Sequence, residues 1–301
     1  MPDTTSTLYR FTFFAMAAEN EVQVHSQDPA LAERAANAAI AEVKRIEAKY
    51  SRYLDDSVVS RINAQAGGAP VKVDDETLAL LAFADACHRQ SEGLFDATSG
   101  VLRRAWNFKE PRVPAQAELD AILPLVGWEK VEISNAHVRL ARPGMQLDFG
   151  GFGKEYAVDR AARVMADLGV ASAMVNLAGD LAILGSQPGD APWRVGIKHP
   201  RRDDKLLATL PVTSGAIATS GDYERFIEVD GVRHCHVLDP RTGRAARGLQ
   251  AVTVQAAACI LAGSATTIAM LKGREAGLAW LDELGLAYLA VTDDGTVIDR
   301  F

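Results

Sequence analysis

A run of strand-like segments without helices between most of them is the feature that most constrains this fold. The segments follow one another at 173–177, 181–184, 194–198, 206–212, 223–229, 232–238 and 250–255. Asp230-Gly231, between two of them, is a strong hairpin signal. A doubly wound parallel sheet needs a crossover, usually a helix, between its strands. The pattern therefore predicts an α+β fold of mixed, mostly antiparallel sheets with flanking helices.

Helical patterns surround these strands. Asp28-Pro29 predicts a helix start with Asp28 as the N-cap, and residues 8–26 read as two strands before it. Further helices are expected at 74–92, 115–123, 153–168, 263–271 and 275–284. Three short strands are expected between 129 and 148, the last being the MQLDF segment that starts at Met145. No linker composition divides the chain, so residues 1–301 are interpreted as one domain.

Charge and cysteine content exclude several classes of protein. The 32 Lys and Arg against 39 Asp and Glu give a net charge of −7, which argues against a nucleic-acid partner. No apolar run reaches the roughly 18 residues that a membrane helix needs. Cys87, Cys235 and Cys259 are too widely spaced for a disulfide framework or a zinc site. The first 16 residues do not read as a signal peptide, so we expect a cytoplasmic protein with no membrane contact.

Familiar catalytic motifs are absent from the sequence. The stretch from Gly150 to Glu155 fails as a P-loop, because Asp148 occupies the first glycine position and Glu155 follows Lys154. It fails the dinucleotide pattern because Tyr156 stands at the third glycine position. No G-x-S-x-G, H-E-x-x-H or C-x-x-C is present, which argues against the hydrolase, zinc-protease and thioredoxin classes.

Four other segments contain residues that could form part of a functional site, and each also has a purely structural interpretation. Segment 148–159 contains the end of a strand, three glycines and the start of a helix that bears Lys154. This arrangement could bind a phosphate group, or it could simply be a tight turn. The segments 175–180 and 218–225 suit a site, or form an Asx turn and a loop with a surface ion pair. In 234–243, His234 and His236 alternate along a strand and cannot share a metal, while the following turn could present Arg241 to an anion.

Taken in order, these segments resemble the FAD:protein FMN transferase family, also called ApbE-like proteins, over nearly the whole chain. The matching stretches are Ser51-Arg-Tyr53, Ser60-Arg-Ile-Asn63, Phe95-Asp-x-Thr98, Asp148-Phe-Gly-Gly151, Lys154-x-Tyr-Ala-Val-Asp159, Val175-Asn-Leu-Ala-Gly-Asp180, Ala218-Thr-Ser-Gly-Asp-Tyr-Glu-Arg225 and His236-x-x-Asp-Pro-Arg-Thr-Gly243. The resemblance implies an ApbE-like fold of two closely packed lobes with a flavin in the cleft between them.

The resemblance also implies a reaction. Family enzymes use Mg²⁺ to split FAD, pass FMN to a Thr or Ser hydroxyl of a target flavoprotein, and release AMP. Positions that match or shape the FAD site are Met16, Tyr53, Asn63, Leu94, Phe95, Asp96, Asp148, Lys154 and Val237. His236, Asp180 and Asp239 are candidates for orienting the phosphates or the incoming hydroxyl. The Thr267 side chain and the Gly151 carbonyl match family metal ligands.

Three positions depart from the family pattern. Met16-Ala17-Ala18 replaces Met-Gly-Thr, Lys154-Glu155-Tyr156 replaces Lys-Gly-Tyr, and Gly263 stands where the family has a metal-binding Asp. Glu155 and Asp239 are candidates to replace the missing acid, because Mg²⁺ prefers an anionic oxygen ligand. A Gly263→Asp substitution is expected to increase Mg²⁺-dependent FAD cleavage. A non-catalytic FAD-binding protein and an FAD pyrophosphatase stay open as alternative functions.

Overall fold

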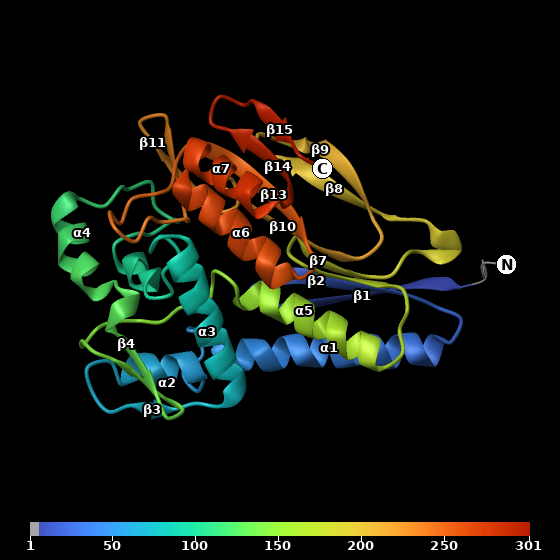
Figure 1. Cartoon of the computed structure of the whole chain (residues 1–301), viewed down its shortest axis with the longest axis horizontal. Coiled ribbons are helices and arrows are strands. Elements are labelled where there is room, and N and C mark those ends of the chain that lie inside the picture. The colour runs from blue at the N-terminus through green and yellow to red at the C-terminus, as the bar shows by residue number, and fades with distance from the viewer. Residues whose placement is uncertain (1–5) are drawn as a thin grey trace.

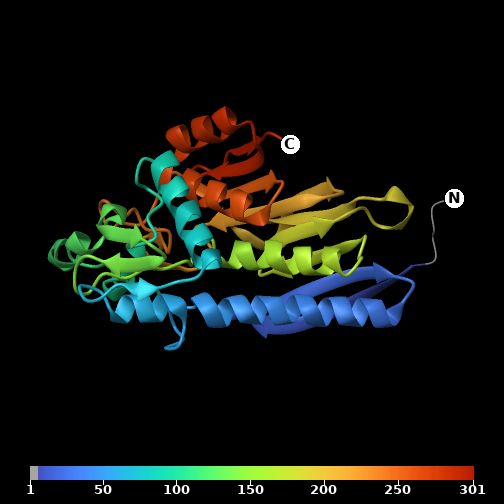
Figure 2. The same ribbon diagram turned by 60° about the horizontal axis from the view of Figure 1, so that its bottom comes forward.

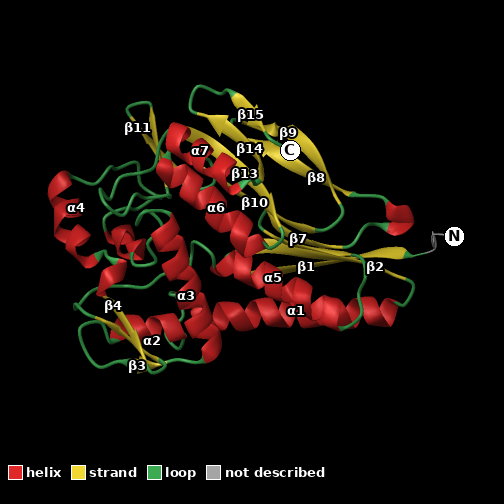
Figure 3. Cartoon of the chain, viewed as in Figure 1, coloured by secondary structure: helices red, strands yellow, loops and turns green. Residues whose placement is uncertain are grey.

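A computed structural model describes residues 6–301 and is built around an eight-stranded sheet (Figures 1 and 3). Every neighbouring pair in the sheet is antiparallel, in the order β1-β2-β6-β7-β10-β13-β14-β15. Its strands are β1 (Thr7–Ala15), β2 (Ala18–Ser26), β6 (Ala173–Leu177), β7 (Asp180–Leu184), β10 (Gly215–Gly221), β13 (Leu249–Ala256), β14 (Ala287–Thr292) and β15 (Val297–Asp299). The antiparallel α+β prediction is confirmed.

Helices cover one face of this sheet. The α-helices within residues 6–301 are α1 (Pro29–Tyr50), α2 (Val58–Ala64), α3 (Asp75–Gln90), α4 (Gln116–Ile122), α5 (Gly153–Asp167), α6 (Cys259–Lys272) and α7 (Arg274–Leu284). Figure 2 shows α1 lying along β1 and β2, while α5 and α6 pack on the middle strands. The predicted start of α1 is confirmed, because Pro29 is its first residue and the Asp28 carboxylate accepts a hydrogen bond from Ala30 N at 2.9 Å.

The opposite face of the sheet is covered by the hairpin of β8 (Trp193–His199) and β9 (Arg202–Val212). Strand β7 shows the alternation that separates the two sides. Leu181 and Ile183 pack with Trp193 of the hairpin, whereas Ala182 packs in the core beneath the helices. Asp180 is two residues from Ala182, so β7 delivers its carboxylate to the helix side of the sheet.

A second group of elements lies beside one end of the large sheet, on the left of Figure 1. It contains α2, α3, α4, a small sheet of β3 (Val71–Lys72), β5 (His137–Leu140) and β4 (Val131–Ser134), and the hairpin of β11 (Phe226–Val229) and β12 (Val232–Cys235). The reading of residues 1–301 as one domain stays a prediction. Its first five residues lie outside those described. None of the helices within 6–301 has the length and apolar character needed to cross a bilayer.

Some local predictions are wrong. The segment Met145–Phe149 forms no strand, and two of its backbone amides bond to groups outside any sheet. Leu147 N donates to the Asn63 side chain at 2.7 Å, and Asp148 N donates to Ala97 O at 2.8 Å. Strand β10 was missed altogether, since its polar end reads as a loop, yet it pairs with β7 and β13 inside the sheet.

Candidate functional site

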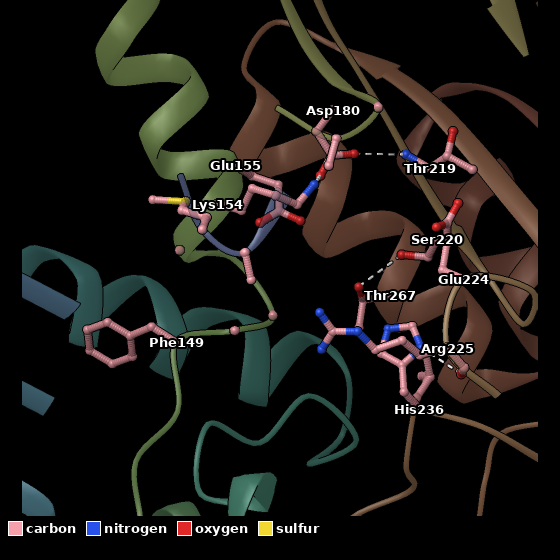
Figure 4. Close-up of a pocket in the computed structure, with 18 of the residues that line it drawn as sticks. Phe149, Lys154, Glu155, Asp180, Thr219, Ser220, Glu224, Arg225, His236 and Thr267 are labelled. Carbon is pink, nitrogen blue, oxygen red and sulfur yellow. Dashed lines mark hydrogen bonds and ion pairs between the residues drawn. The ribbon is translucent and has the colours of Figure 1, made fainter. Parts of the chain in front are cut away.

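A cleft of about 1170 Å³ is the setting of the candidate site, a volume large enough for a dinucleotide-sized ligand. It is lined from β7, β10, the start of α5, one side of α6 and the segments after α1 and α3 (Figure 4). The sequence-predicted residues that line it are Met16, Tyr53, Leu94, Phe95, Asp96, Asp148, Gly151, Lys154, Asp180, His236, Val237 and Thr267. Residues from all parts of the chain therefore meet at one place.

The turn into α5 is built around Asp148 and two glycines. Asp148 Oδ2 accepts a hydrogen bond from the Arg52 guanidinium at 2.9 Å, and Oδ1 accepts from Gly150 N at 2.8 Å. Gly151 passes close to the Phe95 ring, and a Cβ on it would lie 3.0 Å from Phe95 Cζ. A side chain at this position would require the Phe95 ring to shift, because the backbone runs directly against it.

Lys154 and Asp180 form an ion pair at the centre of the cleft (Figure 4). The Lys154 ammonium also donates to Leu177 O at 3.2 Å, and the Asp180 carboxylate accepts from Thr219 N at 3.3 Å. Burial works against the charge of Lys154, but the carboxylates of Asp180 and Glu155 outweigh it and raise the pKa of Lys154. Lys154 is therefore a fixed cation at the start of a helix, an arrangement suited to phosphate.

Glu155 is a buried acid beside this pair. Its side chain faces Gly263 on α6, where an added Cβ would lie 2.5 Å from Glu155 Cγ. Glu155 is 8% exposed, and its Oε2 atom has no hydrogen-bond partner. Burial, followed by the nearby Asp180 charge, raises the pKa of Glu155 to about 8. The sequence offered both Glu155 and Asp239 as replacements for the acid missing at Gly263, and the fold places Glu155 in contact with Gly263.

A cluster of hydroxyl groups faces Glu155 and Lys154 across the cleft, contributed by β10 and α6. Ser220 Oγ lies 2.8 Å from Thr266 Oγ1 and 3.2 Å from Thr267 Oγ1. Thr266 Oγ1 in turn donates to Gly263 O at 2.8 Å. Sequence reasoning missed Ser220 as a site residue. The signal was available in the alternation of β10, where Ala216 and Ala218 face the helices and Ser220 continues the same face.

His236 lines the cleft beside Arg225 (Figure 4). Its Nδ1 lies 3.3 Å from Arg225 O, and burial together with the Arg103 charge lowers the pKa of His236 to about 4. The imidazole is therefore neutral near pH 7. His234 packs instead against Trp106, with ring centroids 5.8 Å apart. The two histidines meet different surroundings, but β12 ends at Cys235 and His236 follows it, so the prediction that both alternate along one strand is wrong.

Of three residues that the sequence predicts to contact FAD, two are held by hydrogen bonds and one is exposed. Met16 is in a two-residue hairpin turn, and its amide donates to Glu47 Oε1 at 2.6 Å. Asp96 is buried in the cleft wall, where its carboxylate accepts from Thr98 N at 2.7 Å and Trp128 N at 3.0 Å. Tyr53 is 74% exposed at the edge of the cleft.

Two predicted site residues do not line the cleft. Asn63 pairs with both backbone groups of Leu147, at 2.9 and 2.7 Å, and so fixes the segment that leads to Asp148. Asp239 accepts from Arg241 N at 2.8 Å inside the turn that follows β12, and lines a separate small hollow. The fold gives Asn63 a positioning role and Asp239 a turn-forming role.

The donors near Glu155 suit a hard divalent cation better than a soft one. Within residues 6–301, no group of three His, Cys, Asp or Glu side chains is arranged to hold a metal. The Glu155 carboxylate, the Thr267 hydroxyl and the Gly151 carbonyl all line the cleft, and all are oxygen donors. Mg²⁺ binds to proteins through few carboxylates and keeps several water ligands, so such a sparse oxygen set fits it.

Comparison with known proteins gives a consistent result. Residues 9–290 match the model of the ApbE family. The chain is 31% identical to the FAD:protein FMN transferase of Rhodobacter capsulatus over 95% of its own length and 56% of that protein's length. It is 31% identical to the enzyme of the same name from Vibrio cholerae, over 84% of this chain and 78% of that one.

Solved structures agree with the sequence relatives. The crystal structure of the ApbE protein of Thermotoga maritima superposes with a TM-score of 0.89 at 33% identity, covering 98% of this chain and 97% of that one. The apo form of the flavinyl transferase ApbE from Pseudomonas stutzeri gives a TM-score of 0.88 at 30% identity, over 98% and 95% of the two chains.

Proposed function

The chain belongs to the ApbE family, and on this premise we propose that it is an FAD:protein FMN transferase. In the reaction, a Thr or Ser hydroxyl oxygen of a target flavoprotein bonds to the FMN phosphorus of FAD. The bond from that phosphorus to the bridging oxygen breaks, AMP leaves with that oxygen, and the hydroxyl loses its proton. The chain spans 56% of the Rhodobacter relative, so the proposal concerns the part of that protein that the chain matches.

One observation carries the proposal. Twelve of the fourteen positions expected from sequence to serve FAD, metal or catalysis line a single cleft, with Asn63 and Asp239 as the two exceptions. Lys154 and the α5 N-terminus supply positive charge that can bind a pyrophosphate, which is negatively charged at physiological pH. We assign Asp180 to the orientation of Lys154, and neutral His236 to hydrogen bonding with the phosphates or the incoming hydroxyl.

Mg²⁺ is part of the proposal, with Thr267 and the Gly151 carbonyl among its ligands. When bound, the ion neutralises charge on the phosphoryl oxygens and orients the leaving group. We further propose a target flavoprotein with a Thr or Ser acceptor motif and a cytoplasmic location. The location is supported by Cys87, Cys235 and Cys259, which are free and buried.

A single reaction tests the transferase function. The protein is mixed with FAD, Mg²⁺ and a flavoprotein domain that carries an Asp-Gly-x-x-Thr-Gly-Ala-Thr type of acceptor. AMP is followed by chromatography and the acceptor by intact mass. The proposal expects AMP together with an FMN-sized mass gain. AMP without labelled acceptor indicates a pyrophosphatase, and bound FAD without AMP indicates a flavin-binding protein.

A further inference from the structure

Helices α5 and α6 lie against each other in opposite directions, and two acids on α5 face α6. The Asp159 carboxylate accepts hydrogen bonds from Cys259 N at 2.7 Å and Ile260 N at 2.9 Å, at the first turn of α6. Glu155 is one turn earlier on α5, on the same face. It therefore meets α6 one turn further along, at Gly263. The register of the helix pair fixes which residue Glu155 faces.

The space at this contact holds one side chain. A Cβ on Gly263 would lie 2.5 Å from Glu155 Cγ and 2.8 Å from Glu155 Oε1, distances that require the glutamate to move. The sequence resemblance expects a glycine on α5 and an acid on α6 at these two positions. In this chain the glycine is on α6 and the acid is on α5. The Glu155 side chain therefore occupies space next to Gly263 that a side chain at position 263 would need.

One oxygen of the buried Glu155 carboxyl group has no partner within residues 6–301 of the protein. Glu155 is 92% buried, since 8% of it is exposed, and its Oε2 has no hydrogen-bond partner. The neighbouring cation Lys154 is already paired with Asp180. Ionising a carboxyl group at this buried position without a partner would cost several kcal/mol. A divalent cation would remove that cost.

From this geometry we infer that Glu155 supplies the anionic ligand to a divalent cation of the Mg²⁺ class, in place of an acid at position 263. Thr267 and the Gly151 carbonyl, which line the same cleft, complete the protein's share of oxygen ligands. The inference rests on the proposed function for the identity of the site, but it assigns a role to a residue that the family pattern leaves as glycine. The rival explanation is that Glu155 is a neutral acid that fills space.

Mn²⁺ binding to the full chain tests the inference without using activity. Free Mn²⁺ is measured by electron paramagnetic resonance during titration, first without FAD and then with FAD. Glu155→Gln keeps the shape of the side chain and removes its charge, and we expect at least a tenfold weaker Mn²⁺ affinity. Asp167→Asn, at the other end of α5, is the matched control and should leave the affinity unchanged. A wild-type protein that fails to bind Mn²⁺, or a Glu155→Gln variant that binds equally well, overturns the inference.

Moving the carboxylate back to α6 is the stricter test. We expect Glu155→Gly to lose Mn²⁺ binding at least tenfold, and the double variant Glu155→Gly with Gly263→Asp to recover it to within about threefold. Gly263→Asp alone places two acids in one space, so it should not bind Mn²⁺ better than wild type. This reverses the expectation drawn from sequence alone. A folded double variant, with an unchanged circular dichroism spectrum, that binds no better than Glu155→Gly overturns the inference.

The two proposals fail separately. Glu155-dependent Mn²⁺ binding without any AMP release would support the proposed cation site and refute the transferase function. A labelled acceptor and AMP from the wild type, together with normal Mn²⁺ binding by Glu155→Gln, would leave the transferase standing and remove the role of Glu155.

Discussion

Replacing Asp159 with alanine should destabilise the protein through the start of α6. The residue before this helix is Ala258, which has no side-chain oxygen to cap it. Asp159 performs the capping from α5 instead, with bonds of 2.7 and 2.9 Å to the first two amides. Asp159→Ala would leave both amides without this partner and would remove two hydrogen bonds that link α5 to α6.

The size of this effect can be worked from the two hydrogen bonds. A hydrogen bond to a charged group contributes about 1.5–3 kcal/mol, so two give about 3–6 kcal/mol. Burial raises the pKa of Asp159, which shows that desolvation offsets part of this gain. We therefore expect a loss of about 2–4 kcal/mol. With an m-value of about 3 kcal/mol/M for urea, the unfolding midpoint should fall by about 1 M.

Urea unfolding followed by circular dichroism is the assay, with Asp167→Ala as the control. Asp167 is at the end of α5 and pairs with Arg163 on the surface, so its loss should change the free energy of unfolding by less than about 0.5 kcal/mol. If Asp159→Ala and Asp167→Ala unfold at the same urea concentration, Asp159 does not cap α6 and the reasoning is refuted.

Three further predictions address other parts of the protein. Ala17 has a φ of 61° in the hairpin turn, so Ala17→Gly should relieve about 1–2 kcal/mol of strain, less about 0.4–1 for chain entropy, and raise the melting temperature. A hydrogen bond from Arg45 keeps the pKa of Glu76 below its usual range, so its stabilisation is complete above about pH 4.5 and is lost on acidification. Glu76→Gln should therefore cost about 1–2 kcal/mol at pH 7 and less at pH 3, and an equal cost at both would contradict this. Lys154→Ala should weaken FAD binding at least tenfold in a fluorescence titration, whereas unchanged affinity would remove Lys154 from the pyrophosphate site.

Local sequence signals predicted correctly those elements whose start or turn is set by neighbouring residues. Asp28-Pro29 predicted the start of α1, because capping and a fixed proline φ act within one turn. Asp230-Gly231 predicted the hairpin of β11 and β12 for a similar reason. The strand prediction failed at Met145–Phe149, where the Leu147 amide donates to the side chain of the distant Asn63 rather than to a neighbouring strand. Tertiary partners of that kind leave no mark on the local pattern.

The polar end of β10 shows why site residues were harder to predict than the elements around them. Thr219 and Ser220 read as a loop because hydroxyls and a following glycine favour turns. The fold places them inside a sheet, where Thr219 N donates to Asp180 and Ser220 lies against Thr266. Side chains that serve a ligand break the apolar pattern of their strand, so the positions most useful to function were those most easily mistaken for a loop.

Glu155 and Gly263 illustrate the same limit between two helices. Read along the chain, they are two distant departures, one adding a charge near the phosphates and the other removing a metal ligand, and Glu155 is only one of two candidates to replace that ligand. In the fold they occupy one space, so a substitution at either position changes what the other can hold. Residues in contact are not expected to behave additively. Glu155 and Gly263 therefore act as a pair. The loss of Mn²⁺ affinity on changing both residues should be smaller than the sum of the losses caused by the two single changes.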